Sequence, residues 1–111
     1  MAKTDAEVRA IINKYLEYVA KQIPVTKAIL YGSYAKGNAV DNSDIDVAIE
    51  SPEFGDNYLK DWQFLYRCVW RSGVDPILEP RPIHATMNPL INEEIKKHGV
   101  IVFESEVSLS N

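Results

Sequence analysis

Tyr31-Gly32-Ser33-Tyr34-Ala35-Lys36-Gly37, followed after five residues by Ser43-Asp44-Ile45-Asp46-Val47, is the stretch that decides the fold of this 111-residue chain. A Gly-Ser pair after an apolar run is typical of a tight turn that leads from a strand into a helix. Backbone N–H groups at such a helix start bind phosphate oxygens. The second segment alternates carboxylates with apolar residues, and hard cations such as Mg²⁺ take carboxylate oxygens as ligands. The stretch therefore predicts a site for a polyphosphate and its metal ion.

Regular elements are expected on both sides of this stretch. Thr4 and Glu7 form a capping box for an amphipathic helix that ends before Pro24. Strands are expected at 28–31 and 45–49, with a short helix at 33–36 between them. Further along the chain the pattern predicts a helix at 57–71, a proline-bearing edge strand at 74–83, a helix at 88–98 with Asn88 as its N-cap, and a last strand at 100–103. This order predicts an α/β (α+β) fold in which helices pack on a small mixed β-sheet.

The predicted strand at 45–49 sorts its side chains onto two faces. Its isoleucines and Val47 are expected to face the core, while Asp44 and Asp46 share the opposite face. The two carboxylates then lie about 6–7 Å apart at Cα, with no Lys or Arg next to them in the sequence. A divalent cation would remove their mutual repulsion, and the alternative is a pair of solvated acids where a loop meets a strand.

Composition narrows the class of protein. With 46% hydrophobic and 25% charged residues, the chain is expected to form one domain over 1–111, with a polar tail from about 104. The net charge of −4 argues against a broad nucleic-acid-binding surface. The apolar runs are too short to cross a membrane, the N-terminus lacks a signal-peptide core, and the single cysteine, Cys68, is expected to be a buried thiol. These features together predict a cytoplasmic protein.

The segment from Tyr31 to Val47 resembles the signature of the DNA polymerase β-like nucleotidyltransferase superfamily: an apolar residue, Gly and then Gly or Ser, a spacer of roughly ten residues, and Asp-apolar-[Asp/Glu]-apolar. The length and the helix-first layout are similar to its smallest branch, the minimal nucleotidyltransferase (MNT) domain. The resemblance implies a third carboxylate on a later strand, for which Glu79 and Asp75 are both candidates. Glu79 is preferred because it follows an apolar pair, whereas Asp75 precedes a proline. A Glu departs from the commoner Asp at this place.

The resemblance also implies a reaction and its participants. Gly32 and Ser33 would bind the β- and γ-phosphates of a nucleoside triphosphate, with ATP preferred, and Lys36 is a further candidate contact. Asp44, Asp46 and Glu79 would be the catalytic carboxylates and would hold Mg²⁺, or Mn²⁺, in a two-metal centre. A nucleoside monophosphate would pass to a hydroxyl acceptor.

The expected partners follow from the same resemblance. Minimal nucleotidyltransferase domains often act as the antitoxin of a HEPN-class toxin, so a separate protein partner or a homo-oligomer is expected. One alternative is a non-catalytic nucleotide-binding module in a two-protein complex. The other is an interaction protein whose acids are only solvated.

Overall fold

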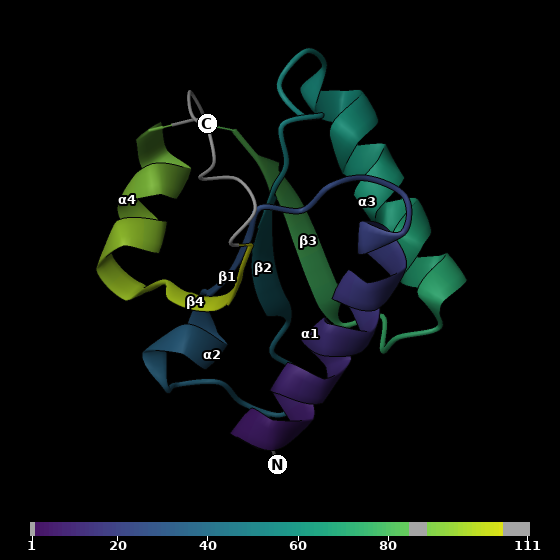
Figure 1. Cartoon of the computed structure of the whole chain (residues 1–111). Coiled ribbons are helices and arrows are strands. Elements are labelled where there is room, and N and C mark those ends of the chain that lie inside the picture. Colours follow the sequence, from purple (N-terminus) through teal and green to yellow (C-terminus); the bar gives the residue numbers. More distant parts are fainter. Residues whose placement is uncertain (1, 85–88, 106–111) are drawn as a thin grey trace.

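A computed structural model describes residues 2–84 and 89–105 of the chain (Figure 1). Its elements are, in chain order, α1 (Asp5–Ala20), β1 (Lys27–Tyr31), α2 (Ser33–Lys36), β2 (Ile45–Glu50), α3 (Tyr58–Ser72), β3 (Leu78–Ile83), α4 (Pro89–His98) and β4 (Val100–Glu104). The predicted order of helices and strands is confirmed. The expected N-cap Asn88 and the end of the expected tail, from 106 on, lie outside the described residues. No helix in the described ranges is long and apolar enough to cross a membrane.

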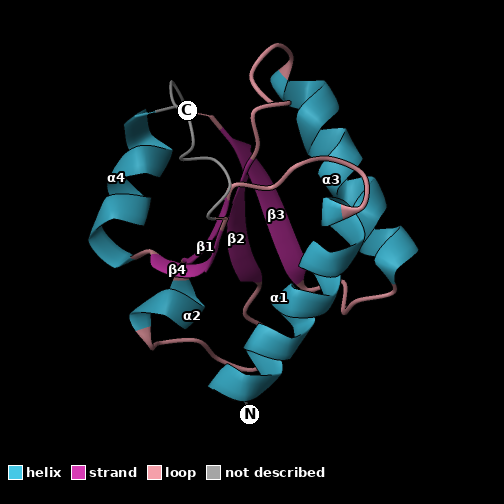
Figure 2. Cartoon of the chain, viewed as in Figure 1, coloured by secondary structure: helices cyan, strands magenta, loops and turns pink. Residues whose placement is uncertain are grey.

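The strands form one mixed sheet in the order β3-β2-β1-β4 (Figure 2). Strand β1 pairs antiparallel with both β2 and β4, whereas β2 and β3 are parallel. Parallel neighbours need a crossover connection, and α3 supplies it. A mixed sheet with helices packed on it is the fold class that the sequence predicted.

Helices α1 and α3 cover one face of the sheet, and α4 lies over the other (Figure 1). On the α1–α3 face, Ile45, Val47 and Ile49 are completely buried, as the alternation in β2 predicted. On the α4 face a smaller cluster forms, in which Ile95 packs against side chains that include Ala48. Asp46 precedes Ala48 by two residues and shares its face, so the acids lie on the face that has the smaller apolar cluster.

The ends of the long helices are fixed by local contacts. The capping box at the start of α1 is complete: Thr4 N donates to Glu7 Oε1 at 2.8 Å, and Glu7 N donates to Thr4 Oγ1 at 3.1 Å. At the start of α3, the Asn57 side chain accepts from Lys60 N at 3.1 Å. Helix α3 ends at Gly73, whose φ of +74° is the left-handed conformation that glycine adopts without strain.

The third strand is shorter than predicted. The sequence pattern placed it at 74–83, but β3 begins only at Leu78. The Asp75 side chain accepts from Ile77 N at 3.1 Å, and Leu78 N donates to the Asp75 carbonyl, so the chain makes a turn there. The prediction of an edge strand is confirmed, because β3 lies at one end of the sheet order and carries two prolines that cannot donate to a further strand.

A buried hydrogen bond joins the two long helices. Tyr15 is fully buried in α1, and its hydroxyl donates to the Leu65 carbonyl of α3 at 2.8 Å. We expect Tyr15→Phe to lower the free energy of unfolding by about 1 kcal/mol, because the ring still packs but the hydrogen bond is lost. Urea denaturation measures this change. Tyr18→Phe, on a partly buried tyrosine of the same helix, is the matched control, and an equal loss in both variants would contradict the assignment.

Candidate functional site

The turn between β1 and α2 is built on Gly32. This residue has φ +75° and ψ −154°, a conformation open almost only to glycine, and it is the N-cap of α2. Lys36 N donates to the Gly32 carbonyl at 3.1 Å, and Gly37 closes the short helix with φ +81°. Ser33, the first residue of α2, is half-buried. The chain therefore forms the predicted strand–turn–helix, with backbone N–H groups free at the helix start to meet an anion.

The turn and the acids meet directly. A Cβ built on Gly32 would collide with Asp46 Oδ2, so the Asp46 carboxylate lies against the glycine and leaves no room for a side chain there. Tyr31, the residue before the glycine, is the antiparallel register partner of Asp46. The pairing of β1 with β2 thus brings together two motifs that are separated by a loop in the sequence.

Glu79 joins Asp46 from the other side. In the parallel pairing of β2 with β3, Asp46 and Glu79 are register partners, so their side chains leave the same face of the sheet. Asp44 stands just before β2 and is exposed, while Asp46 and Glu79 are half-buried. Asp46 is therefore the central acid, with the glycine turn on one side and Glu79 on the other.

Asp75, the alternative third carboxylate, is placed elsewhere. Its Oδ2 lies 3.3 Å from Lys3 Nζ, and its side chain also accepts from Ile77 N. That backbone hydrogen bond is the main reason why the pKa of Asp75 is lowered. Asp75 thus lies in the turn ahead of β3 and is held by these contacts, whereas Glu79 is the register partner of Asp46. The identity of the third carboxylate stays a prediction.

Negative charge accumulates around Asp46. Burial, followed by the carboxylates of Asp44 and Glu79, raises the pKa of Asp46 to about 6, and Arg81 opposes this rise. Glu94 of α4 adds a further, smaller push in the same direction. A group of acids that repel one another at one point is the electrostatic setting that a divalent cation stabilises.

The fit to a metal ion is partial. Asp44, Asp46 and Glu79 supply the hard oxygen donors that Mg²⁺ takes; Asp46 and Glu79 share one face of the sheet, and Asp44 lies just before β2. Within the ranges that the structure describes, however, no three His, Cys, Asp or Glu side chains converge closely enough to hold a metal ion. The donor chemistry therefore fits, but the three carboxylates do not converge in this structure.

Three residues that sequence reasoning missed lie at this site. Burial, followed by the nearby Glu79 carboxylate, raises the pKa of Tyr66 of α3. Arg81 is two residues beyond Glu79 on the same face of β3, and its charge lowers the pKa of Asp46. The third residue is Glu94 of α4, whose carboxylate contributes to the raised pKa of Asp46.

One pattern in the sequence includes Tyr66, the first of these three residues. Aromatic residues recur every four positions along α3, at Tyr58, Trp62, Tyr66 and Trp70, which places them in a row along the helix. Such a row is also typical of core packing. In the structure Trp70 is 73% exposed and Tyr58 is 51% exposed, so the row runs along the surface beside β3.

Lys36, the candidate phosphate contact, is held by an acid. Its Nζ lies 3.2 Å from Oε2 of Glu94, which joins α2 to α4 across the end of β1. The contribution of Lys36 to nucleotide binding stays a prediction.

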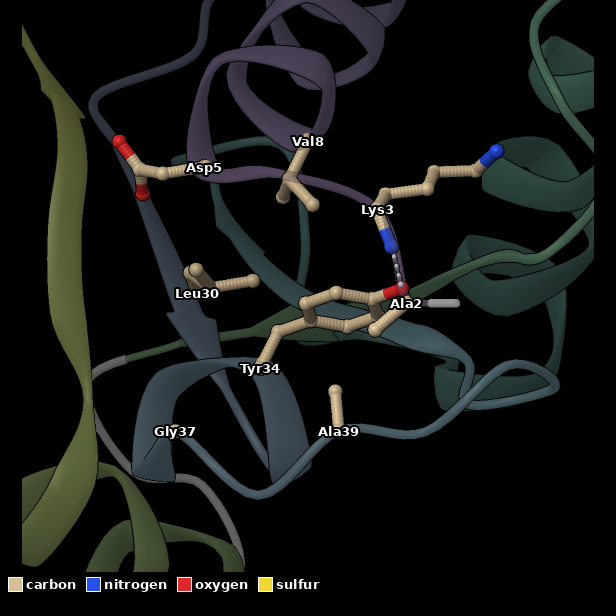
Figure 3. A pocket seen from close by; sticks show the side chains of 8 residues that line it. All are labelled: Ala2, Lys3, Asp5, Val8, Leu30, Tyr34, Gly37 and Ala39. Atoms are coloured by element: carbon tan, nitrogen blue, oxygen red, sulfur yellow. Dashed lines mark hydrogen bonds between the residues drawn. The ribbon is translucent and has the colours of Figure 1, made fainter.

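A small cavity of about 210 Å³ lies on the opposite side of the turn (Figure 3). It opens between the start of α1 and α2, where Val8, Leu30 and Tyr34 line it. Lys3 N donates to the Tyr34 hydroxyl at 3.1 Å at its edge. Asp44, Asp46 and Glu79 do not line this cavity; Leu30 and Val8, which do, belong to the core on the α1–α3 face.

Solved structures similar to this chain share its fold. A Sulfolobus solfataricus protein described as a "putative nucleotidyltransferase" superposes with a TM-score of 0.65 at 20% identity, covering 96% of this chain and 94% of that one. A chain of a toxin–antitoxin structure with AMP-PNP gives a TM-score of 0.57 at 20% identity, over 90% of this chain and 76% of that one. A chain from the complex of the tri-AMPylated Shewanella oneidensis HEPN toxin with its MNT antitoxin gives 0.56 at 16% identity, over 91% and 76%.

Sequence relatives and a family model identify the class of protein. The Methanocaldococcus jannaschii protein named "Putative protein adenylyltransferase MJ1379" is 29% identical over 105 residues, which cover 90% of this chain and 99% of the relative. A second protein of that organism, "Putative protein adenylyltransferase MJ1215", is 36% identical over 58 residues, covering 52% of this chain and 66% of the relative. The model of the nucleotidyltransferase domain family matches residues 12–106. The Gly-Ser turn, the Asp-x-Asp strand and this match together lead to one conclusion: the chain belongs to the nucleotidyltransferase domain family.

Proposed function

We propose that this protein transfers AMP from ATP to a hydroxyl group on a separate protein. The observation that carries the proposal is the meeting of Gly32 with Asp46 and the register pairing of Asp46 with Glu79. A phosphate-binding turn and a line of carboxylates at one point suit the chemistry of nucleotidyl transfer, which requires positioning and charge neutralisation above all. The names of the sequence relatives, which are given as protein adenylyltransferases, support ATP and a protein acceptor.

The residues of the site would bind the phosphates and the metal ion separately. The backbone N–H groups after Gly32 and the Ser33 hydroxyl bind the β- and γ-phosphates, and Lys36 adds a positive charge beside them. Asp44, Asp46 and Glu79 would hold Mg²⁺, which, when bound, neutralises charge on the phosphates. Glu79 lies on the edge strand β3.

The transfer step replaces one bond at the α-phosphorus of ATP with another. The acceptor oxygen forms a bond to the α-phosphorus, and the bond from that phosphorus to the oxygen bridging to the β-phosphate breaks. Pyrophosphate leaves, AMP stays on the acceptor, and the hydroxyl proton passes to the neighbouring carboxylates. The in-line geometry is set by the turn on one side and by Glu79 on the other.

A HEPN-class protein is the acceptor that we propose, and the cytoplasm is the compartment. Two observations support a protein partner. Structural neighbours of this chain come from toxin–antitoxin complexes, one of them with an AMPylated HEPN toxin. Leu59 and Trp70 of α3 are 60% and 73% exposed, and large exposed apolar side chains of this kind are commonly buried against another protein.

Label transfer tests the proposal. The protein is incubated with Mg²⁺, a candidate HEPN-class protein and ATP labelled at either the α- or the γ-phosphate. We expect the α-label on the HEPN-class protein, no transfer of the γ-label, and release of pyrophosphate. Asp46→Asn should transfer nothing, while Asp56→Asn, at an exposed loop carboxyl, should behave as wild type. Equal transfer by wild type and Asp46→Asn would contradict the proposal.

A second candidate function is a module that binds nucleotide and a partner without turnover. Two observations favour it: Glu79 stands where the family commonly has Asp, and the described acids do not converge into a three-ligand group. Calorimetry separates the two functions. Binding of Mg·ATP without pyrophosphate release, with and without the partner, would support the module over the enzyme.

A further inference from the structure

Lys36 and Glu94 form an ion pair between two helices at the edge of the site. Lys36 is the last residue of α2, the short helix that begins at the Gly32 turn, and Glu94 lies in α4. Lys36 Nζ is 3.2 Å from Glu94 Oε2, and the two side chains are 36% and 35% exposed. In the described part of the chain, Oε2 of Glu94 is shielded from water and has no hydrogen-bond partner, so the nearby ammonium compensates its charge.

The ion pair helps to hold α4 against the rest of the chain. Ile95 of this helix packs against the small apolar cluster on its face of the sheet, and Glu94, the residue before it, reaches Lys36. Glu93 and Lys96, on either side of these two residues, are exposed. Because the apolar contact of one side chain buries only a small area, the attachment of α4 to α2 depends in part on the charge of Lys36.

Glu94 holds the ammonium that a bound triphosphate would attract. Ser33, which follows the Gly32 turn, and Lys36 are three residues apart on one helix, so their side chains lie on the same side of it. A triphosphate at this turn carries several negative charges and offers several oxygens, whereas Glu94 offers one carboxylate. The ammonium is therefore drawn more strongly to the triphosphate than to Glu94.

We propose that Glu94 is a positioning residue that holds Lys36 in the nucleotide-free protein and yields it to the triphosphate, so that nucleotide binding frees α4 from α2. The inference rests on the proposed function, in which a nucleoside triphosphate binds at the Gly32 turn. Glu94 acts through Lys36 and does not touch the phosphates. Because breaking the ion pair costs free energy, the Glu94 carboxylate lowers the affinity for the triphosphate.

Glu94→Gln tests the effect on affinity, because it removes the charge and nearly keeps the shape of the side chain. We expect the affinity for Mg·ATP, measured by calorimetry, to rise about fivefold, which is the upper range for a partly exposed ion pair. Glu93→Gln, on the exposed neighbour in α4, is the matched control and should change the affinity by less than about twofold. Weaker binding in Glu94→Gln would overturn the proposal, because Glu94 would then hold Lys36 in its binding position.

A double-mutant cycle separates the ion pair from the general charge of α4. Lys36→Gln alone should weaken Mg·ATP binding about fivefold. In the Lys36→Gln background, adding Glu94→Gln should change the affinity by less than about twofold, because the carboxylate then has no ammonium to hold. An equal rise in both backgrounds would overturn the proposal, since Glu94 would then act by repelling the phosphates. Thermal unfolding of both single variants checks that the fold is intact.

Hydrogen exchange of the backbone amides of α4 tests the release of the helix. Without nucleotide, exchange should be faster in Lys36→Gln and in Glu94→Gln than in wild type. Saturating Mg·ATP should speed exchange of α4 in wild type and leave it unchanged in Glu94→Gln, where the ion pair is already absent. Slower exchange of α4 in wild type with Mg·ATP would contradict the release, because the helix would then close on the nucleotide.

Failure of this inference and failure of the proposed function give different results. AMP transfer by wild type, together with wild-type affinity in Glu94→Gln, leaves the function standing and removes the role of Glu94. Binding of Mg·ATP without AMP transfer removes the transfer function, while the affinities of the variants still decide the role of Glu94. An absence of Mg·ATP binding by wild type contradicts both.

Discussion

Gly32→Ala is expected to abolish Mg·ATP binding and to lower the free energy of unfolding by about 1–3 kcal/mol. The backbone there has φ +75°, which an L-residue rarely adopts, and the new Cβ would collide with Asp46 Oδ2. The clash must be relieved by moving either the turn or the central carboxylate, and both belong to the proposed site. Calorimetry with Mg·ATP and urea denaturation measure the two effects.

Gly37→Ala is the matched control for this experiment. Gly37 also has a positive φ, +81°, but a Cβ built there meets nothing within 4 Å. This variant should therefore lose about 1 kcal/mol of stability from backbone strain alone and keep its affinity for Mg·ATP. Equal binding in Gly32→Ala and Gly37→Ala would contradict the close approach of the glycine to the acid as a requirement for binding.

Asp46→Asn should have opposite effects on function and on stability. Transfer should fall by about 10³-fold or more, because loss of a carboxylate that neutralises the phosphates costs several kcal/mol in the transition state. The fold should become more stable at neutral pH, because in the wild type burial and the acids around Asp46 disfavour its charged form. Functional sites often carry such a stability cost.

The effect of Asp46→Asn on the free energy of unfolding depends on pH. The pKa of Asp46 is raised to about 6 in the folded chain, above the ordinary value of 3.8. The folded state therefore holds the proton more tightly, and the resulting stabilisation is present below about pH 4 and lost as the pH rises through about 6. Because the side chain is half-exposed and water screens it, we expect Asp46→Asn to exceed wild type by only about 1 kcal/mol at pH 7.5.

Urea denaturation from about pH 3 to pH 8 in EDTA measures the difference between the two proteins. The gap should narrow as the pH falls through about 6 and close only below 3.8, where Asp46 is protonated in both the folded and the unfolded chain. Asp56→Asn, at an exposed loop position, should follow wild type over the same range. A gap that is constant with pH would show that the substitution acts through packing and not through the charge of Asp46.

The local sequence was sufficient to predict the helices and strands and two separate motifs of the site. The capping box at Thr4, the cap at Asn57 and the glycines at 32, 37 and 73 act within a few residues of their own position, so their effects can be read without the fold. The alternation in β2 likewise fixes which residues are buried. The Gly-Ser turn and the Asp-x-Asp strand were therefore predictable as separate motifs.

The differences between the prediction and the structure have local as well as long-range causes. The third strand was predicted four residues too long at its start, because a side-chain turn at Asp75 competes with extension of the strand. An aromatic row such as the one on α3 is also typical of core packing, yet Trp70 is 73% exposed, since the helix buries only the side that meets β3 and α1. The ion pair of Lys36 with Glu94 joins residues 58 positions apart and has no local signal.

The sequence by itself determined the order of helices and strands, the phosphate-type turn and the pair of acids, because each depends on short-range propensities and spacing. Only the tertiary structure decided how these parts form a site. The register of the parallel pair β2 and β3, which α3 connects, sets Glu79, and not Asp75, beside Asp46, and a one-residue shift would have turned Glu79 to the other face. The same packing brings α3 against β3, which no spacing in the sequence specifies.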